Sequence, residues 1–117
     1  MASASEPAAR AWTPAMELDE LWEGDMTAVD VNGTQVLLVN VDGDVQAYRN
    51  RCPHQESNLD EGEFEDGRIT CWRHHWEFDA RTGAGLNPDD TALTRYPCRV
   101  DDAGMIHVDV TGGNPRP

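Results

Sequence analysis

Positively charged residues are scarce in this sequence of 117 residues. Lys and Arg together number 9 against 22 Asp and Glu, which gives a formal net charge of −13. Such a surface repels nucleic acid and anionic lipid, so neither is an expected partner. It attracts a basic patch on another protein and speeds their encounter at low salt. Acidic charge also serves solubility, and charge alone leaves both interpretations open.

Long apolar runs are also missing. Hydrophobic residues make up 38% of the chain, and no run approaches the length of a membrane-spanning helix. Residues 1–11 have neither a basic start nor an apolar stretch, so we expect a cytoplasmic protein without a secretory signal. The length suits one domain with a lean core, which a metal centre would help to stabilise. We expect this domain over residues 12–110, between disordered tails at 1–11 and 111–117.

Cysteine is rare as well, with three residues in the chain. In a cytoplasmic protein, three cysteines argue against a disulfide framework and favour metal binding or catalysis. The odd number fits two ligands and one spare thiol. We expect Cys98 to be the spare thiol, as a small buried hydrophobic residue.

The apolar residues that are present recur mostly with a period of two, which predicts short strands. Strands are expected at 26–31, 35–41, 45–48, 68–71, 76–79, 95–100 and 105–110, with hairpin turns at 32–33 and 42–43. Segment 35–41 is nearly all apolar and is predicted to be central, while a helical turn is expected only at 17–22. His107 is predicted to face solvent, on one strand face with Met105 and Asp109. These features predict an all-β antiparallel sandwich or barrel.

Four side chains suited to metal binding form the most informative pattern. Cys52 and His54 stand on one segment, and Cys71 and His74 stand on a second segment after sixteen intervening residues. Two Cys and two His can hold one zinc ion, so a zinc-stabilised interaction module is one interpretation. Zinc fingers, however, usually pair cysteines on one segment and histidines on the other. A mixed pair on each segment favours a two-iron cluster, with both thiolates on one iron and both imidazoles on the other.

With this ligand pattern the sequence resembles the Rieske family, whose signature is C-x-H followed by C-x-x-H. The likeness continues through Leu59, Gly62 and Gly67 and through the run G-A-G-L-N-P-D-D at 83–90. It is strongest to the ferredoxins of multicomponent di-iron hydrocarbon monooxygenases of the toluene-4-monooxygenase-like kind, and it covers about residues 12–110. The resemblance implies a Rieske ISP-like fold, a cluster-binding subdomain of two ligand loops at about 50–90, and one [2Fe–2S] cluster per chain.

The function that this resemblance implies is one-electron transport. The chain would carry electrons from an NADH-dependent flavin or iron–sulfur reductase to the di-iron hydroxylase of an aromatic or alkene monooxygenase. Alternatives are a ferredoxin of an aromatic-ring-hydroxylating dioxygenase, a small Rieske subunit of a nitrite reductase, and a redox sensor. A cluster with four protein ligands has no open site for substrate, so we expect no enzymatic activity from the chain alone. A monomer is expected.

Residues beside the ligands are expected to tune the cluster. Respiratory Rieske proteins carry a disulfide between their two loops and direct Ser and Tyr hydroxyls at the cluster. By the resemblance, the disulfide positions are Ser57 and Arg73 here, and the hydroxyl positions are Trp76 and Phe78. Because these donors are missing, we expect a potential near the low end of the Rieske range, about −150 mV.

Other neighbours of the ligands have expected roles in shielding or docking. Trp76, Phe78 and Pro88 are predicted to shield the cluster from water. Pro88 would do so from a third loop that includes Gly83 and Gly85, although an ordinary strand connection is the alternative. Gly62 and Gly67 are expected to be turn residues.

Four residues are candidates for partner docking: Gln55, Glu56, Trp72 and His75. His75 would point away from the cluster if its segment is extended. Trp72 would serve either as an exposed anchor or as packing at the loop base.

Overall fold

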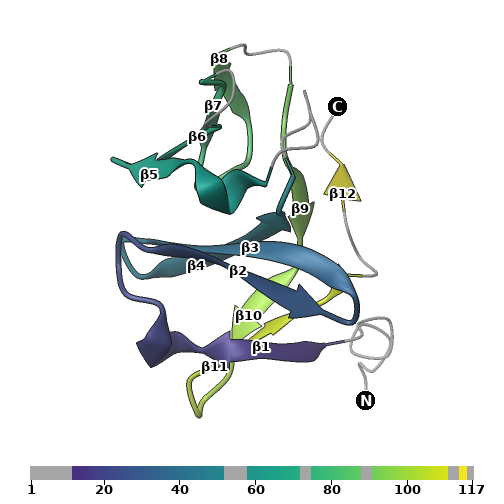
Figure 1. Cartoon of the computed structure of the whole chain (residues 1–117). Helices are drawn as coiled ribbons and strands as arrows, with labels where there is room; N and C mark the ends of the chain where they lie inside the picture. Colours follow the sequence, from purple (N-terminus) through teal and green to yellow (C-terminus); the bar gives the residue numbers. More distant parts are fainter. Residues whose placement is uncertain (1–11, 52–57, 72–74, 88–90, 111–113, 116–117) are drawn as a thin grey trace.

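The chain folds into three antiparallel β-sheets in a computed structural model that describes residues 12–51, 58–71, 75–87, 91–110 and 114–115 (Figure 1). The predicted all-β antiparallel fold is confirmed. The elements in chain order are β1 (Thr13–Glu17), the 3₁₀ turn η1 (Leu18–Glu20), β2 (Met26–Val31), β3 (Thr34–Val41), β4 (Asp44–Arg49), the 3₁₀ turn η2 (Leu59–Glu61), β5 (Glu63–Glu65), β6 (Arg68–Thr70), β7 (Glu77–Asp79), β8 (Gly85–Asn87), β9 (Thr94–Tyr96), β10 (Cys98–Val100), β11 (Met105–Val108) and β12 (Asn114–Pro115).

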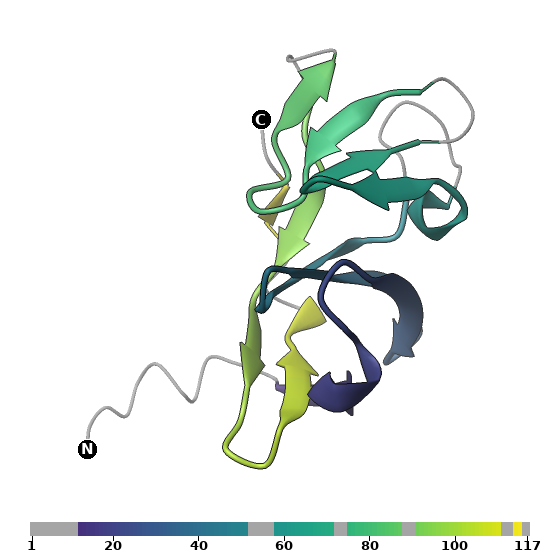
Figure 2. The same cartoon turned by 90° about the vertical axis from the view of Figure 1, so that its left-hand side faces the viewer.

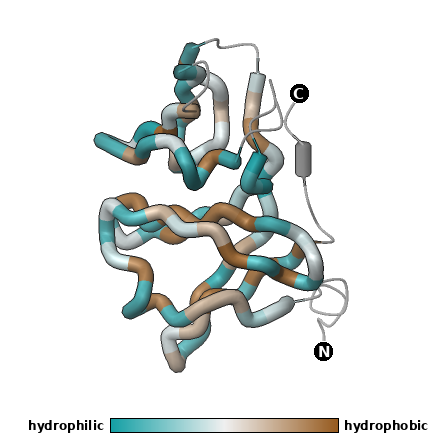
Figure 3. The backbone as a smooth tube through the Cα atoms, in the orientation of Figure 1, coloured by the Kyte–Doolittle hydropathy of each residue, from teal (hydrophilic) through white to brown (hydrophobic). Residues whose placement is uncertain are grey.

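The sheets are stacked as layers, with a five-stranded sheet in the middle (Figures 1 and 2). Its strand order is β12-β9-β4-β3-β2. On one side lies the four-stranded sheet β5-β6-β7-β8, and on the other side lies the three-stranded sheet β1-β11-β10. We call these two the cluster sheet and the base sheet. Brown, hydrophobic stretches follow the middle sheet, whereas hydrophilic teal is prominent at β5 (Figure 3).

The position of β3 explains its apolar sequence. Leu37, Val39 and Val41 belong to the core between the middle sheet and the cluster sheet. Val36 and Leu38, whose side chains point the opposite way, belong to the core beneath the middle sheet. Both faces of the strand are therefore buried, and the predicted central place of segment 35–41 is confirmed.

The two predicted hairpin turns are confirmed. Asn32 and Gly33 join β2 to β3, and Asp42 and Gly43 join β3 to β4, with the flanking strands paired antiparallel. All four turn residues have positive φ, from 54° to 96°. This is the geometry that a two-residue hairpin with the twist of the strands requires, and Asn-Gly and Asp-Gly adopt it most easily.

Other boundaries differ from the prediction. The expected strand 95–100 is two strands, because the chain passes from the middle sheet to the base sheet at Pro97, which has no N–H to donate. The expected strand 105–110 is β11, which ends at Val108. Asp109 is buried, and its N–H donates to the Pro97 carbonyl at 3.1 Å. The placement of Asp109 on a solvated face was therefore wrong. Within 17–22, only Leu18–Glu20 form a helical turn, since Glu17 completes β1.

The sequence pattern predicts none of β1, β5, β8 and β12. All four are edge strands of their sheets. An edge strand is short and buries little, so it imposes weak alternation on the sequence. In the described ranges, no helix is long and apolar enough to cross a membrane. Residues 1–11, 111–113 and 116–117 lie outside the described part, so the predicted domain limits stay predictions.

Candidate metal centre

Cys71 is the one expected ligand that falls within the described residues. It directly follows β6 and is 1% exposed, in the core that also contains Ile69 and Phe78. Its thiol is free of any disulfide. Cys52, His54 and His74 lie outside the described residues, and so do Gln55, Glu56, Ser57, Trp72, Arg73 and Pro88.

The segment that follows Cys71 is closed at its ends by two backbone hydrogen bonds. The Cys71 N–H donates to the Trp76 carbonyl at 2.8 Å, and the His75 N–H donates to the Cys71 carbonyl at 2.9 Å. His75 has φ = 59° and an exposed side chain. The backbone at His75 is therefore left-handed and not extended, while its side chain lies at the surface as expected. In the sequence, the predicted ligand position 74 falls between these hydrogen-bonded residues.

The segment that carries positions 52 and 54 is clamped in a different way. Asn50 is 1% exposed, and its side-chain amide donates to Asp60 Oδ1 at 2.8 Å. The Asp60 N–H in turn donates to Asn50 Oδ1 at 3.0 Å. The Asn50 N–H also donates to the Gln35 carbonyl on β3, at 3.0 Å. Both ends of the segment are thus tied together and to the middle sheet.

Gly62 lies against the backbone of Thr70, the residue before Cys71. A Cβ atom built at Gly62 would lie 2.0 Å from the Thr70 carbonyl oxygen, closer than any real side chain permits. Its φ of −92° is accessible to every residue, so glycine is needed here for space rather than for a turn. Gly62 also closes the η2 turn, because its N–H donates to the Leu59 carbonyl at 2.9 Å, so its expected place in a turn agrees with the structure. The approach of Thr70 is a constraint that the sequence does not reveal. Gly67, with φ = 73° in the turn between β5 and β6, agrees with its predicted role.

The predicted shielding residues lie next to Cys71 where the structure describes them. Phe78 is fully buried in the same core, and Trp76 is partly buried against it. Neither side chain carries a hydroxyl that could bond a cluster sulfur. Gly85 belongs to β8 rather than to a loop, so part of the predicted third loop is strand.

The loop between β7 and β8 is held by Tyr48 of the middle sheet. The Tyr48 hydroxyl donates to the Ala80 carbonyl at 2.7 Å, and burial raises the pKa of this hydroxyl well above its ordinary value. A Cβ atom at Gly83, where φ is 83°, would lie 2.8 Å from the Tyr48 ring. Close backbone approach thus explains the glycine at this position.

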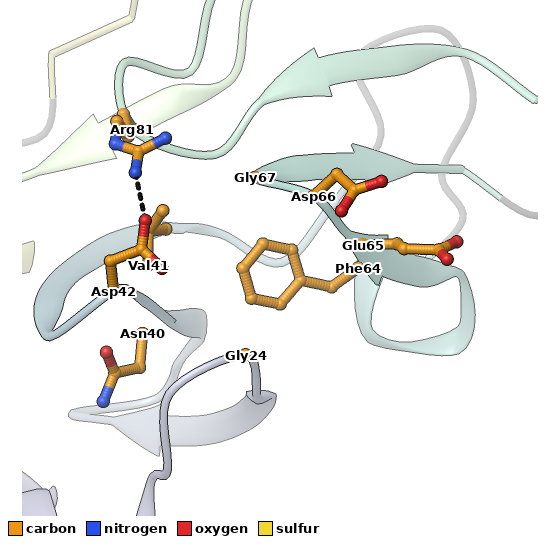
Figure 4. Close-up of a pocket in the computed structure, with 9 residues that line it drawn as sticks. All are labelled: Gly24, Asn40, Val41, Asp42, Phe64, Glu65, Asp66, Gly67 and Arg81. Carbon is orange, nitrogen blue, oxygen red and sulfur yellow. Dashed lines mark hydrogen bonds and ion pairs between the residues drawn. The ribbon is translucent and has the colours of Figure 1, made fainter.

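Two polar grooves flank the cluster sheet. One, of about 410 Å³, lies where Asp42 at the β3–β4 turn forms an ion pair with Arg81 at 2.5 Å, beside Phe64 (Figure 4). The other, of about 320 Å³, has His75 in its lining together with four carboxylate side chains and one arginine. The surface next to the second ligand segment is therefore acidic.

Cys98 and His107 were also singled out in the sequence, and both lie away from Cys71 on the base sheet. Cys98 packs against the core below the middle sheet, and burial raises the pKa of its thiol to about 11. A thiol held protonated in this way suits the expected role of a small hydrophobic residue.

His107 is 20% exposed, and its Nε2 lies 2.8 Å from Asp101 Oδ2. The prediction of a solvated His107 was wrong, because the β10–β11 turn brings Asp101 to its ring.

The described residues form an all-β domain in which one expected ligand, the thiol of Cys71, is buried directly after β6. The residues on either side of the other expected Cys-His pair are held together through Asn50 and Asp60. Thiolates and neutral imidazoles in this pairing are the donor set of a Rieske centre. The residues present therefore fit such a cluster.

Comparison with known proteins identifies the family. The Rieske [2Fe-2S] domain family matches residues 11–97. The chain is 41% identical over 90 residues to the ferredoxin component of the alkene monooxygenase system of Xanthobacter autotrophicus, covering 76% of this chain and 74% of that protein. The chain belongs to the Rieske [2Fe–2S] domain family, and its cofactor is a Rieske-type [2Fe–2S] cluster.

Solved structures agree with this assignment. The ferredoxin of carbazole 1,9a-dioxygenase from Nocardioides aromaticivorans matches with a TM-score of 0.76 and 35% identity, over 85% of this chain and 97% of that one. A second match comes from a complex of reduced oxygenase and oxidised ferredoxin in carbazole 1,9a-dioxygenase, with a TM-score of 0.77 and 22% identity over 86% and 94% of the two chains; at this identity it shows the fold alone.

Proposed function

We propose that this protein carries single electrons from an NADH-dependent flavin reductase to the di-iron hydroxylase of a multicomponent hydrocarbon monooxygenase. The observation that carries the proposal is the 41% identity to a ferredoxin component of an alkene monooxygenase system. The buried Cys71 at the base of a closed loop supports it. In this role the chain is a cytoplasmic monomer that transfers electrons and performs no catalysis of its own.

The cluster ligands in this proposal are two mixed pairs. Cys52 and Cys71 would bind one iron as thiolates, and His54 and His74 would bind the other through neutral imidazoles. When bound, the cluster supplies reversible one-electron reduction. The chain holds the ligand segments through the Asn50 clamp and the loop closure at Cys71, described above.

The residues around the cluster would control water and docking. Trp76, Phe78 and Pro88 would exclude water from the cluster. Gln55, Glu56, Trp72 and His75 would contact the oxygenase component.

A second candidate is the ferredoxin of an aromatic-ring-hydroxylating dioxygenase. The 35% identity to the ferredoxin of carbazole 1,9a-dioxygenase, over nearly the whole of that chain, favours it as the alternative. Both candidates share the cluster and the electron transfer, and they differ in the protein that receives the electron.

Reconstituted turnover tests the proposal. Purified holoprotein is mixed with candidate reductase, NADH, and either a di-iron hydroxylase or a Rieske dioxygenase, and hydroxylated product is measured. We expect product with the hydroxylase, no product with Cys71→Ser, and undiminished product with Cys98→Ser, a matched substitution in the other core. Product with the dioxygenase alone would replace the proposal by the second candidate. Equal activity of Cys71→Ser and wild type would refute the ligand assignment.

A further inference from the structure

Arg49 stands out among the arginines of this acidic chain. Three others already have side-chain acceptors: Arg68 pairs with Glu77, Arg81 with Asp42, and Arg95 with Gln46. Arg99 lies over the Trp12 ring, 5.9 Å from its centroid. Arg49 is exposed at the end of β4 and makes no ion pair within the described part of the chain. Its positive charge is therefore available to a group from outside.

Arg49 lines a polar groove of about 390 Å³. The lining also includes Thr34, Asn50, Arg51 and Tyr96, and none of the described residues that form it is acidic. Asp30 of β2 accepts a hydrogen bond from the N–H of Gly33, a lining residue, at 2.8 Å. The groove is thus a positive site on a chain whose formal net charge is −13.

Tyr96, which is 8% exposed, also lines this groove. Its hydroxyl can donate a hydrogen bond, since the pKa of a phenol is near 10 and burial raises it further. Arg49 and Tyr96 line the same groove, and the positive charge of Arg49 lowers the pKa of this hydroxyl, against the effect of burial. A guanidinium fork beside a phenol is a donor set that matches a carboxylate, and arginine binds carboxylates through two parallel hydrogen bonds.

The groove also adjoins the first ligand segment. Asn50 and Arg51 both line it, and they immediately precede the predicted ligand Cys52. Asn50 is the residue that clamps this segment through Asp60. A group held in the groove therefore contacts the residues that directly precede the predicted ligand Cys52.

We propose that this groove receives a carboxylate side chain of the oxygenase component, an inference that rests on the proposed function. A free anion would have to approach against the field of the acidic chain, which disfavours a small-molecule ligand. A carboxylate set in a basic protein surface arrives with that surface, because the partner as a whole is attracted. In such an interface one ion pair has the opposite polarity to the rest, with the positive charge on this chain and the negative charge on the partner. This pair favours the docking orientation in which it forms and penalises others. The groove thus acts as a positioning site, because it fixes the orientation in which this chain docks on the oxygenase.

Charge reversal at Arg49 tests this inference. The dissociation constant between cluster-loaded ferredoxin and oxygenase is measured by calorimetry for wild type, Arg49→Glu and Arg99→Glu. The two variants change the net charge equally, but Arg99 lies on β10 of the base sheet. We expect Arg49→Glu to weaken binding about tenfold and Arg99→Glu less than about threefold. Only Arg49→Glu would set the new glutamate against the carboxylate of the oxygenase. Tyr96→Phe should weaken binding about threefold by removing one donor.

Several results would overturn the inference. Equal weakening by Arg49→Glu and Arg99→Glu, with the wild type bound, would show that net charge alone matters and would leave the proposed function intact. Saturable binding of inorganic phosphate to the wild type, lost in Arg49→Glu, would identify a free anion as the ligand instead. Absence of wild-type binding to any oxygenase would refute the proposed function and this inference with it. Cluster absorbance of each variant confirms that it is folded, and the neutral Arg49→Gln provides a second test with an expected smaller loss.

Discussion

Replacement of Gly62 by alanine should destabilise the protein more than any ordinary surface substitution. The new methyl group would lie 2.0 Å from the Thr70 carbonyl oxygen, whereas carbon and oxygen in contact are about 3.3 Å apart. The backbone must therefore move by about 1.3 Å. Thr70 pairs with Glu63 on one side and Glu77 on the other, so the movement disturbs two strand pairings.

The magnitude follows from these contacts. Overpacking against backbone costs about 1–3 kcal/mol, and each weakened hydrogen bond adds about 1 kcal/mol. We expect Gly62→Ala to lose about 3 kcal/mol, or about 12 °C in melting temperature for a domain of this size. The cluster should also be lost faster to a chelator, because Thr70 immediately precedes Cys71.

Gly104→Ala is the matched control. Gly104 has φ = 86°, and a Cβ atom there would meet nothing within 4 Å. Only left-handed strain remains, at about 1 kcal/mol. Thermal unfolding of both holoproteins, followed by circular dichroism and cluster absorbance, makes the comparison. A Gly62→Ala variant that melts at or above the temperature of Gly104→Ala would refute the close contact between Gly62 and Thr70.

Three further predictions concern the buried tyrosine, the loop clamp and the potential. Burial raises the pKa of the Tyr48 hydroxyl, so this hydroxyl ionises near pH 10 in the unfolded chain but not in the folded chain. The free energy of unfolding should therefore be unaffected by this group below about pH 10 and should fall as the pH rises above it. Ultraviolet titration should therefore show Tyr48 ionising only on alkaline unfolding, and ionisation in the folded state near pH 10 would contradict this. Asn50→Ala removes both hydrogen bonds to Asp60, and iron release to a chelator should become several-fold faster; an unchanged rate would show that the clamp does not hold the loop. The reduction potential should lie near −150 mV, because Trp76 and Phe78 offer no hydroxyl to the cluster. A redox titration that gives a clearly positive value would contradict this explanation.

Local patterns were sufficient to predict the centre of the fold. The apolar segment 35–41 lies between two cores, and the turns at Asn32 and Asp42 have a backbone geometry that short-range chemistry dictates. Cys71 was singled out by its spacing from His74, and the structure buries it at the base of a closed loop. The remaining ligand positions stay predictions.

Features that depend on long-range contacts were not predictable. The need for glycine at position 62 arises because the chain after the first ligand segment passes against Thr70, which no local pattern reveals. His107 alternates like a solvent-facing residue, yet the β10–β11 turn brings Asp101 to its ring. Pro97 is visible in the sequence, but its role in passing the chain between two sheets depends on where those sheets lie.

The central claim is that this chain holds a two-iron cluster with Cys71 as a ligand. Electron paramagnetic resonance of purified protein, together with iron, sulfide and zinc analysis, tests it most directly. We expect red-brown protein with two irons and two sulfides per chain, which gives no resonance signal when oxidised and a cluster signal after reduction. That signal should be lost in Cys71→Ser but not in Cys98→Ser. Colourless protein with one zinc ion per chain would contradict it.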